Sequence, residues 1–134
     1  MKIAKLFLAG CLVVTTLFSC SKDNEEPPAP VTGVAGKWVG TYGFGNETPH
    51  VFYSLNIKTN GVIEELNKSG NSKGDGSWNL NGSVFTAQYQ WKAPMNSKYS
   101  IKATYNGANG KLSGTWGYDN SATDGGLWEA EKSN

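Results

Sequence analysis

The chain of 134 residues carries twelve lysines, no arginine and eleven acidic side chains, which gives a net charge of +1 at pH 7. A nearly neutral chain lacks the basic field that recruits nucleic acid. Without arginine it also lacks the side chain best suited to bidentate capture of phosphate or carboxylate. The composition therefore disfavours nucleic acids, nucleotides and acidic substrates as partners.

The first predicted element, residues 1–19, is an export signal. Two lysines precede an apolar run over residues 6–14, and this run is shorter than the ~20 apolar residues that span a bilayer. The segment ends in Leu17-Phe18-Ser19-Cys20, which resembles the lipobox of bacterial lipoproteins. The resemblance implies a cleaved signal peptide and an acylated Cys20, carrying palmitate or a similar chain, that anchors the protein to a membrane. The alternative is an ordinary secretory signal or membrane helix with an incidental cysteine.

Residues 20–35 are predicted to form a lipidated, flexible linker. Residues 21–26, Ser-Lys-Asp-Asn-Glu-Glu, resemble the lysine-plus-acid export signal of Bacteroidota lipoproteins, which implies the outer membrane and its outward face. The alternative is a solvated charged spacer. Pro27-Pro28-Ala29-Pro30 adds a stiff, extended stretch. Because Cys11 leaves with the signal, the mature chain forms no disulfide.

The sequence predicts one all-β domain over residues 36–132. No window shows sustained helical periodicity, and segments of alternating hydrophobicity are separated by turn residues. We predict eight strands, over residues 37–44, 51–59, 62–66, 76–80, 83–91, 98–105, 111–117 and 126–131.

The connections between these strands predict two different ends. Asn60-Gly61 and Asn81-Gly82 are two-residue hairpin signals, and residues 106–110 are a slightly longer version. The other connections, residues 45–50, 67–75, 92–97 and 118–125, are longer and lie together at the opposite end of an up-and-down meander. Eight strands in this order leave two open edges unless the first pairs with the last, so we predict a closed barrel.

The tripeptide Gly-x-Trp occurs four times, beginning at residues 36, 76, 114 and 126. A glycine two residues before a tryptophan lies on the same face of a strand and leaves room for the indole or for close backbone approach. The first copy, Gly36-Lys37-Trp38, resembles the signature of the calycins, the lipocalin and avidin-like barrels, in which this tryptophan plugs the closed end. The resemblance implies a lipocalin-like, eight-stranded antiparallel up-and-down barrel. The chain lacks the arginine that covers this tryptophan in lipocalins and the polar residues that bind biotin in avidins, so the resemblance leaves the ligand open.

Strand alternation points a set of aromatic side chains into the barrel. Tyrosine and tryptophan combine an apolar ring with a polar group and suit a half-wet site, such as one that stacks on a sugar, a haem, a flavin or another flat ligand. The alternative is that these rings fill the interior, because an eight-stranded barrel holds either side chains or one small ligand. The candidate ligand-binding residues, placed near the long-loop end, are Tyr42, Tyr53, Trp78, Tyr89, Trp91, Tyr99, Trp116 and Trp128.

No catalytic constellation is visible, so we predict a protein that is not an enzyme and has no cofactor or metal site. His50 is the only histidine and makes a poor metal site alone. Glu64 and Glu65 are adjacent on a strand and face opposite sides, so they cannot act as an acid/base pair. Residues 69–76 are interpreted as a mobile lip and residues 119–126 as a flexible turn.

Two hypotheses from different classes remain. The first is a surface lipoprotein that binds a small amphipathic or glycan ligand in an aromatic barrel mouth. The second is a structural or interaction protein with a filled barrel, whose long loops contact an envelope protein partner. A ligand-sized void between the long loops discriminates between them.

Overall fold

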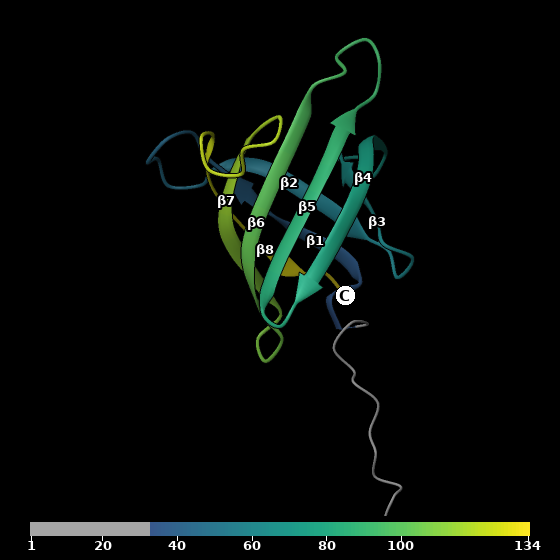
Figure 1. Cartoon of the computed structure of the whole chain (residues 1–134). Coiled ribbons are helices and arrows are strands. Elements are labelled where there is room, and N and C mark those ends of the chain that lie inside the picture. Colours follow the sequence, from purple (N-terminus) through teal and green to yellow (C-terminus); the bar gives the residue numbers. More distant parts are fainter. Residues whose placement is uncertain (1–32) are drawn as a thin grey trace, which may run out of the picture.

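Eight antiparallel strands close into a barrel in the computed structural model, which describes residues 33–134 (Figure 1). Each strand pairs with the next in sequence, and the last pairs with the first, with Gly40 opposite Ala130. The ladder therefore has no open edge, and the predicted all-β, eight-stranded up-and-down barrel is confirmed. The strands are β1 (Gly36–Tyr42), β2 (Val51–Ile57), β3 (Val62–Leu66), β4 (Ser72–Asn81), β5 (Val84–Trp91), β6 (Lys98–Asn106), β7 (Lys111–Tyr118) and β8 (Gly126–Lys132).

The predicted signal peptide, Cys20 and most of the linker lie outside the described residues. Between residues 33 and 134, no helix is both long and apolar enough to cross a membrane.

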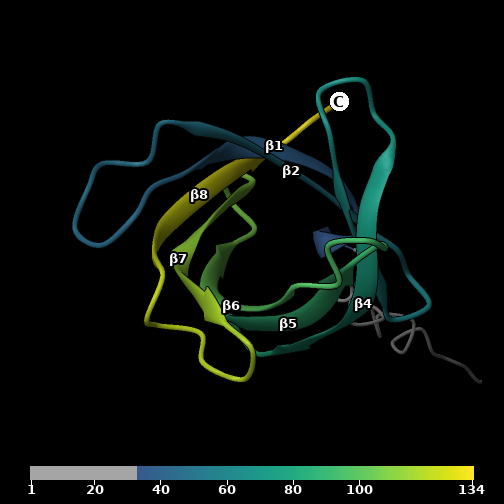
Figure 2. The ribbon, with the colours of Figure 1, turned by 90° about the horizontal axis from the view of Figure 1, so that it is seen from above.

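The alternation of side chains between the two faces of each strand decides what fills the barrel. On β5, Phe85, Ala87 and Tyr89 are buried, and the polar residues between them point outward. Figure 2, seen from above, shows the strands as a ring around the interior. Ser100 lies on the outer face of β6, yet it is only 4% exposed. Its hydroxyl donates a hydrogen bond to the carbonyl of Asp119, because the 119–125 connection folds back over this outer face.

The two ends of the barrel differ as the sequence predicts. Figure 1 shows the 92–97 loop at the top and the 82–83 and 107–110 turns at the bottom. The chain enters the barrel at the tight-turn end, since Gly36 begins β1 there, opposite Ile57.

One long connection was predicted wrongly. β4 begins at Ser72 rather than at residue 76, so residues 72–76 belong to a strand and are no mobile lip. Their glycine-rich composition suggested a loop, but Gly74 pairs with Glu65 on one side and Trp91 on the other. These two ladders satisfy the backbone, and the turn contracts to residues 67–71.

Two of the Gly-x-Trp glycines have a clear structural reason. A Cβ atom on Gly76 would overlap the carbonyl oxygen of Gln88, and one on Gly114 would overlap that of Lys102. Neighbouring strands therefore approach too closely at these positions for any side chain. Of the two uses that the sequence suggested for these glycines, close backbone approach is the one found here.

The half of the barrel toward the tight turns is filled. The Trp38 indole donates a hydrogen bond of 2.8 Å to the carbonyl of Val34 and meets Tyr105 edge to face. Val34 lies in the predicted linker, yet it is fully buried because the chain packs across the barrel bottom before β1 begins. The side chains that close this half are Val34, Trp38, Leu55, Ile57, Ile63, Phe85, Ile101 and Leu112.

Candidate functional site

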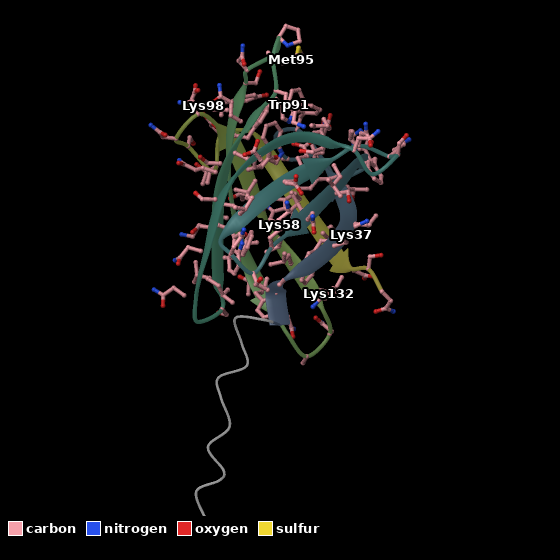
Figure 3. All side chains as sticks on the ribbon, turned by 90° about the vertical axis from the view of Figure 1, so that its right-hand side faces the viewer. Lys37, Lys58, Trp91, Met95, Lys98 and Lys132 are labelled. Carbon is pink, nitrogen blue, oxygen red and sulfur yellow. The ribbon has the colours of Figure 1, made fainter. Side chains whose placement is uncertain are left out.

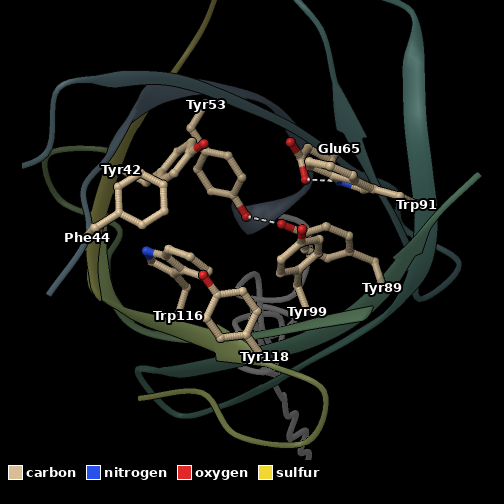
Figure 4. Close-up of a pocket in the computed structure, with 9 residues that line it drawn as sticks. All are labelled: Tyr42, Phe44, Tyr53, Glu65, Tyr89, Trp91, Tyr99, Trp116 and Tyr118. Carbon is tan, nitrogen blue, oxygen red and sulfur yellow. Dashed lines mark hydrogen bonds between the residues drawn. The ribbon is translucent and has the colours of Figure 1, made fainter. Parts of the chain in front are cut away.

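A cavity of about 200 Å³ opens at the long-loop end, above the filled half (Figure 4). Eight of its lining residues belong to β1, β2, β3, β5, β6 and β7, and one comes from the loop after β1. At ~30 Å³ per molecule of liquid water, this volume equals that of about seven waters. The nine lining residues are Tyr42, Phe44, Tyr53, Glu65, Tyr89, Trp91, Tyr99, Trp116 and Tyr118.

Six of the eight predicted ligand-binding residues line this cavity. They are Tyr42, Tyr53, Tyr89, Trp91, Tyr99 and Trp116.

The other two predicted residues, Trp78 and Trp128, lie elsewhere. Because β4 begins earlier than predicted, Trp78 sits farther down the barrel, where it stacks on Phe85 with 6.0 Å between ring centres. Trp128 is 1% exposed and packs edge to face against Tyr53, outside the cavity lining.

The cavity walls are aromatic rings that support one another. Tyr42 meets Trp116 at 5.5 Å and 83°, and it meets Tyr53 at 5.8 Å and 75°. These edge-to-face contacts are a preferred arrangement of aromatic pairs. The Trp116 indole also donates a hydrogen bond of 2.9 Å to the carbonyl of Gly43, which ties the first long loop to β7. The rings are thus held in place without filling the centre.

A buried carboxylate lies on one wall of the cavity. Glu65 is 4% exposed, and its oxygens accept hydrogen bonds from Lys73 Nζ at 2.6 Å and from Trp91 Nε1 at 2.7 Å. Lys73 Nζ also lies 4.1 Å from the centre of the Trp91 ring. A buried charge is costly unless it is paired and hydrogen-bonded, so these partners explain how the carboxylate is tolerated.

The neighbouring acid, Glu64, faces solvent. Its Oε2 lies 3.1 Å from Lys58 Nζ and accepts a hydrogen bond of 3.0 Å from Asn56. The hydrogen bonds from Asn56 and Lys58 lower the pKa of Glu64. The prediction that Glu64 and Glu65 face opposite sides is confirmed.

Two tyrosine hydroxyl groups meet deep in the cavity. Tyr53 Oη and Tyr89 Oη lie 2.8 Å apart, and Figure 4 shows this hydrogen bond. Burial raises the pKa of both Tyr53 and Tyr89 well above the ordinary value, and the negative charge of Glu65 raises each further. Both hydroxyls therefore stay protonated at neutral pH and present donors and acceptors to the cavity.

Sequence reasoning missed three lining residues, Phe44, Glu65 and Tyr118. Phe44 was placed at the end of a strand but lies in the first loop, and Tyr118 was placed in a loop but ends β7. For Glu65 a signal existed, because it shares a strand face with Ile63, which is fully buried. The signal was obscured because β3 is short and the chain shifts register between Glu65 and Leu66.

The polar groups outside the cavity form no metal-binding cluster among the described residues. Within residues 33–134, no three His, Cys, Asp or Glu side chains lie close enough to share a metal ion. His50 is exposed, and Asp124 accepts a hydrogen bond from the backbone N–H of Tyr118, which fixes the last long loop. No known protein family, curated protein or solved structure matches this chain.

Proposed function

We propose that this protein is a lipid-anchored binding module of the bacterial outer membrane, which captures one ring or headgroup of a small amphipathic or glycan ligand in the mouth of its barrel. The proposal places the protein at the cell surface and assigns it no catalytic step. It rests on the aromatic cavity at the long-loop end and on the lipobox-like segment that ends at Cys20.

The single observation that carries the binding function is an unfilled, aromatic cavity above a filled core. Its volume of about 200 Å³ lies below the ~300 Å³ at which pockets for drug-sized ligands begin. A single ring or headgroup suits this space, whereas a whole haem or flavin exceeds it. Tyrosine and tryptophan walls offer apolar faces for stacking and polar groups for orientation.

The direction of the barrel supports a role at a surface. An anchor at Cys20 would precede the tight-turn end, where the chain enters β1 (Figure 1). The cavity is lined by residues at the opposite, long-loop end. The mouth would then face away from the membrane, where a ligand from outside can reach it.

Calorimetric titration of the domain from residue 31 onward against monosaccharides, aromatic amphiphiles and fatty acids tests the binding function. We expect saturable binding to one class and a loss of about tenfold or more in Trp91→Ala, because stacking on one aromatic ring is worth ~1–3 kcal/mol. Trp78→Ala is the matched control, since Trp78 does not line the cavity, and its affinity should stay unchanged. Flat titrations with a folded domain would refute the binding function.

The anchor has a separate test. We expect Cys20→Ser to abolish acylation and to move the protein from the membrane fraction to the soluble fraction. Unchanged fractionation of this variant would refute the lipoprotein assignment without touching the cavity.

A protein partner is the second candidate, favoured by the exposed rim of the cavity. Phe44 and Tyr118 are 47% and 46% exposed, and both pack against Trp116, at 5.7 and 5.1 Å. Exposed aromatic groups of this kind are enriched in protein interfaces. Under this alternative, Phe44→Ser would weaken capture of an envelope protein, while Tyr89→Phe, deep in the cavity, would leave it intact.

A further inference from the structure

The charge of the cavity restricts the ligand class more closely than its shape does. Glu65 is the only carboxylic acid among the nine lining residues, and no lysine, arginine or histidine is among them. In Figure 3, Lys37, Lys58 and Lys132 lie farther down the barrel than Trp91, whereas Lys98 lies at the same end as Trp91. The lining therefore combines one buried carboxylate with eight aromatic rings.

A lining of aromatic rings with a carboxylate has the chemistry of a site that binds organic cations. The face of a tryptophan or tyrosine ring is electrostatically negative and attracts ammonium groups, most strongly where water is excluded. Cages of such rings recognise quaternary ammonium groups. A carboxylate ligand, in contrast, would meet the charge of Glu65 and would have no arginine to pair with.

The protein itself shows that this wall accepts an ammonium group. Lys73 reaches in from β4, and its Nζ lies 2.6 Å from Glu65 Oε1 and 4.1 Å from the centre of the Trp91 ring. Lys73 is not among the lining residues, so it contacts Glu65 and Trp91 without occupying the cavity itself.

The charge of Glu65 reaches the cavity despite its pairing with Lys73. After burial, it is the next cause that raises the pKa of Tyr42 and of Tyr53, and it also raises the pKa of Tyr89 and of Tyr99. These tyrosines stand on four different parts of the wall, on β1, β2, β5 and β6. The charge of Glu65 therefore acts on tyrosines from four parts of the wall.

We infer that the ligand headgroup is an organic cation, a quaternary ammonium or protonated amine, held by the aromatic cage and the carboxylate of Glu65. This inference rests on the proposed function and narrows its ligand class. It also excludes fatty acids and other free carboxylates as ligands of the cavity.

Choline and its neutral isostere dimethylbutanol, in which carbon replaces the quaternary nitrogen, form a matched pair of probes. They have the same shape and hydroxyl group and differ in charge alone. We expect calorimetry to show choline binding about tenfold or more tighter than the isostere, since a desolvated cation–π contact is worth ~2 kcal/mol or more. A ratio near one would overturn the cationic assignment.

Two variants test the role of the carboxylate. Glu65→Gln keeps the shape and removes the charge, so the affinity for choline should fall about tenfold while that for dimethylbutanol stays within about twofold. Lys73→Gln removes the resident cation but keeps a hydrogen-bond donor, so choline should bind several-fold tighter. If Glu65→Gln does not fold, the Lys73→Gln result decides, and an unchanged or weaker affinity for choline overturns the inference.

The panel separates this inference from the proposed function. If a monosaccharide binds while choline and dimethylbutanol do not, the cationic class is wrong and the binding module stands. If no probe binds to the folded domain, both are wrong. Saturable binding of choline that Glu65→Gln weakens supports both.

Discussion

The paired tyrosines in the cavity should make this barrel sensitive to alkali. Tyr53 and Tyr89 are 5% and 6% exposed, and burial raises the pKa of both well above the value in the unfolded chain. A raised pKa means that the folded state holds its proton more tightly. The stabilisation is therefore complete below about pH 10, the ordinary tyrosine pKa, and is lost as the pH rises above it.

The size of the effect follows from proton linkage. Each such tyrosine lowers the free energy of unfolding by about 1.4 kcal/mol per pH unit above pH 10, so the pair should lower it by ~3 kcal/mol at about pH 11. This is a large part of the ~5–15 kcal/mol that stabilises a typical domain. Urea denaturation at about pH 9, 10 and 11 measures this slope.

The double variant Tyr53→Phe/Tyr89→Phe isolates the contribution of this pair to the pH dependence. Removing both partners of the 2.8 Å hydrogen bond together should change stability little at neutral pH, because neither hydroxyl is left unpaired by its partner. When the pH is raised to about 11, the free energy of unfolding of the variant should fall by ~3 kcal/mol less than that of the wild type. Parallel slopes for the two proteins would refute the burial argument.

Three further outcomes follow from the packing. Trp38→Phe should lower the free energy of unfolding by about 2–4 kcal/mol in urea denaturation, because it removes a buried hydrogen bond and leaves a void. Gly114→Ala should lower it by about 3 kcal/mol or more, since the new Cβ would overlap the carbonyl of Lys102. Lys111→Ala should change it by less than ~0.5 kcal/mol, since the 3.4 Å pair with Glu131 is solvent-exposed.

The sequence predicted the architecture because its signals are local and repeated. Asn81 ends β4 and the two-residue turn is Gly82-Ser83, one residue later than predicted. Gly82, with φ of +65°, supplies the positive φ that such a tight hairpin turn uses. The alternation along β5 placed Phe85 and Tyr89 inside. These features depend on neighbours a few residues apart, which a single sequence displays.

The chemistry of the site was harder to predict because it depends on contacts between distant residues. Lys73 was assigned to a loop, since glycines surround it, so its pairing with Glu65 was not anticipated. Trp78 was placed in the mouth because the start of β4 was set four residues too late. An error at one strand boundary changes the predicted position of a side chain along the barrel axis. That position decides whether a ring packs in the core or lines the cavity.

The two hypotheses for the interior each describe one half of the barrel. Toward the tight turns, aliphatic side chains and Trp38 fill the space. Toward the long loops, about 200 Å³ stays open. A dry cavity of this size inside a core would lower the free energy of unfolding by about 5 kcal/mol at ~24 cal/mol per Å³. A small domain avoids this loss if side chains or water fill the space.

The side chains at the mouth favour wetting over filling. Five of the nine lining residues are tyrosines and only one is a phenylalanine, although phenylalanine would pack as well and bury no hydroxyl group. A buried carboxylate on the wall adds a further desolvation cost. Packing alone explains neither the excess of tyrosine over phenylalanine nor the buried carboxylate. A site that orients a polar or charged group needs both the hydroxyl groups and the carboxylate. Under the proposed function, the filled half supplies the stability of the domain and the mouth is left for the ligand.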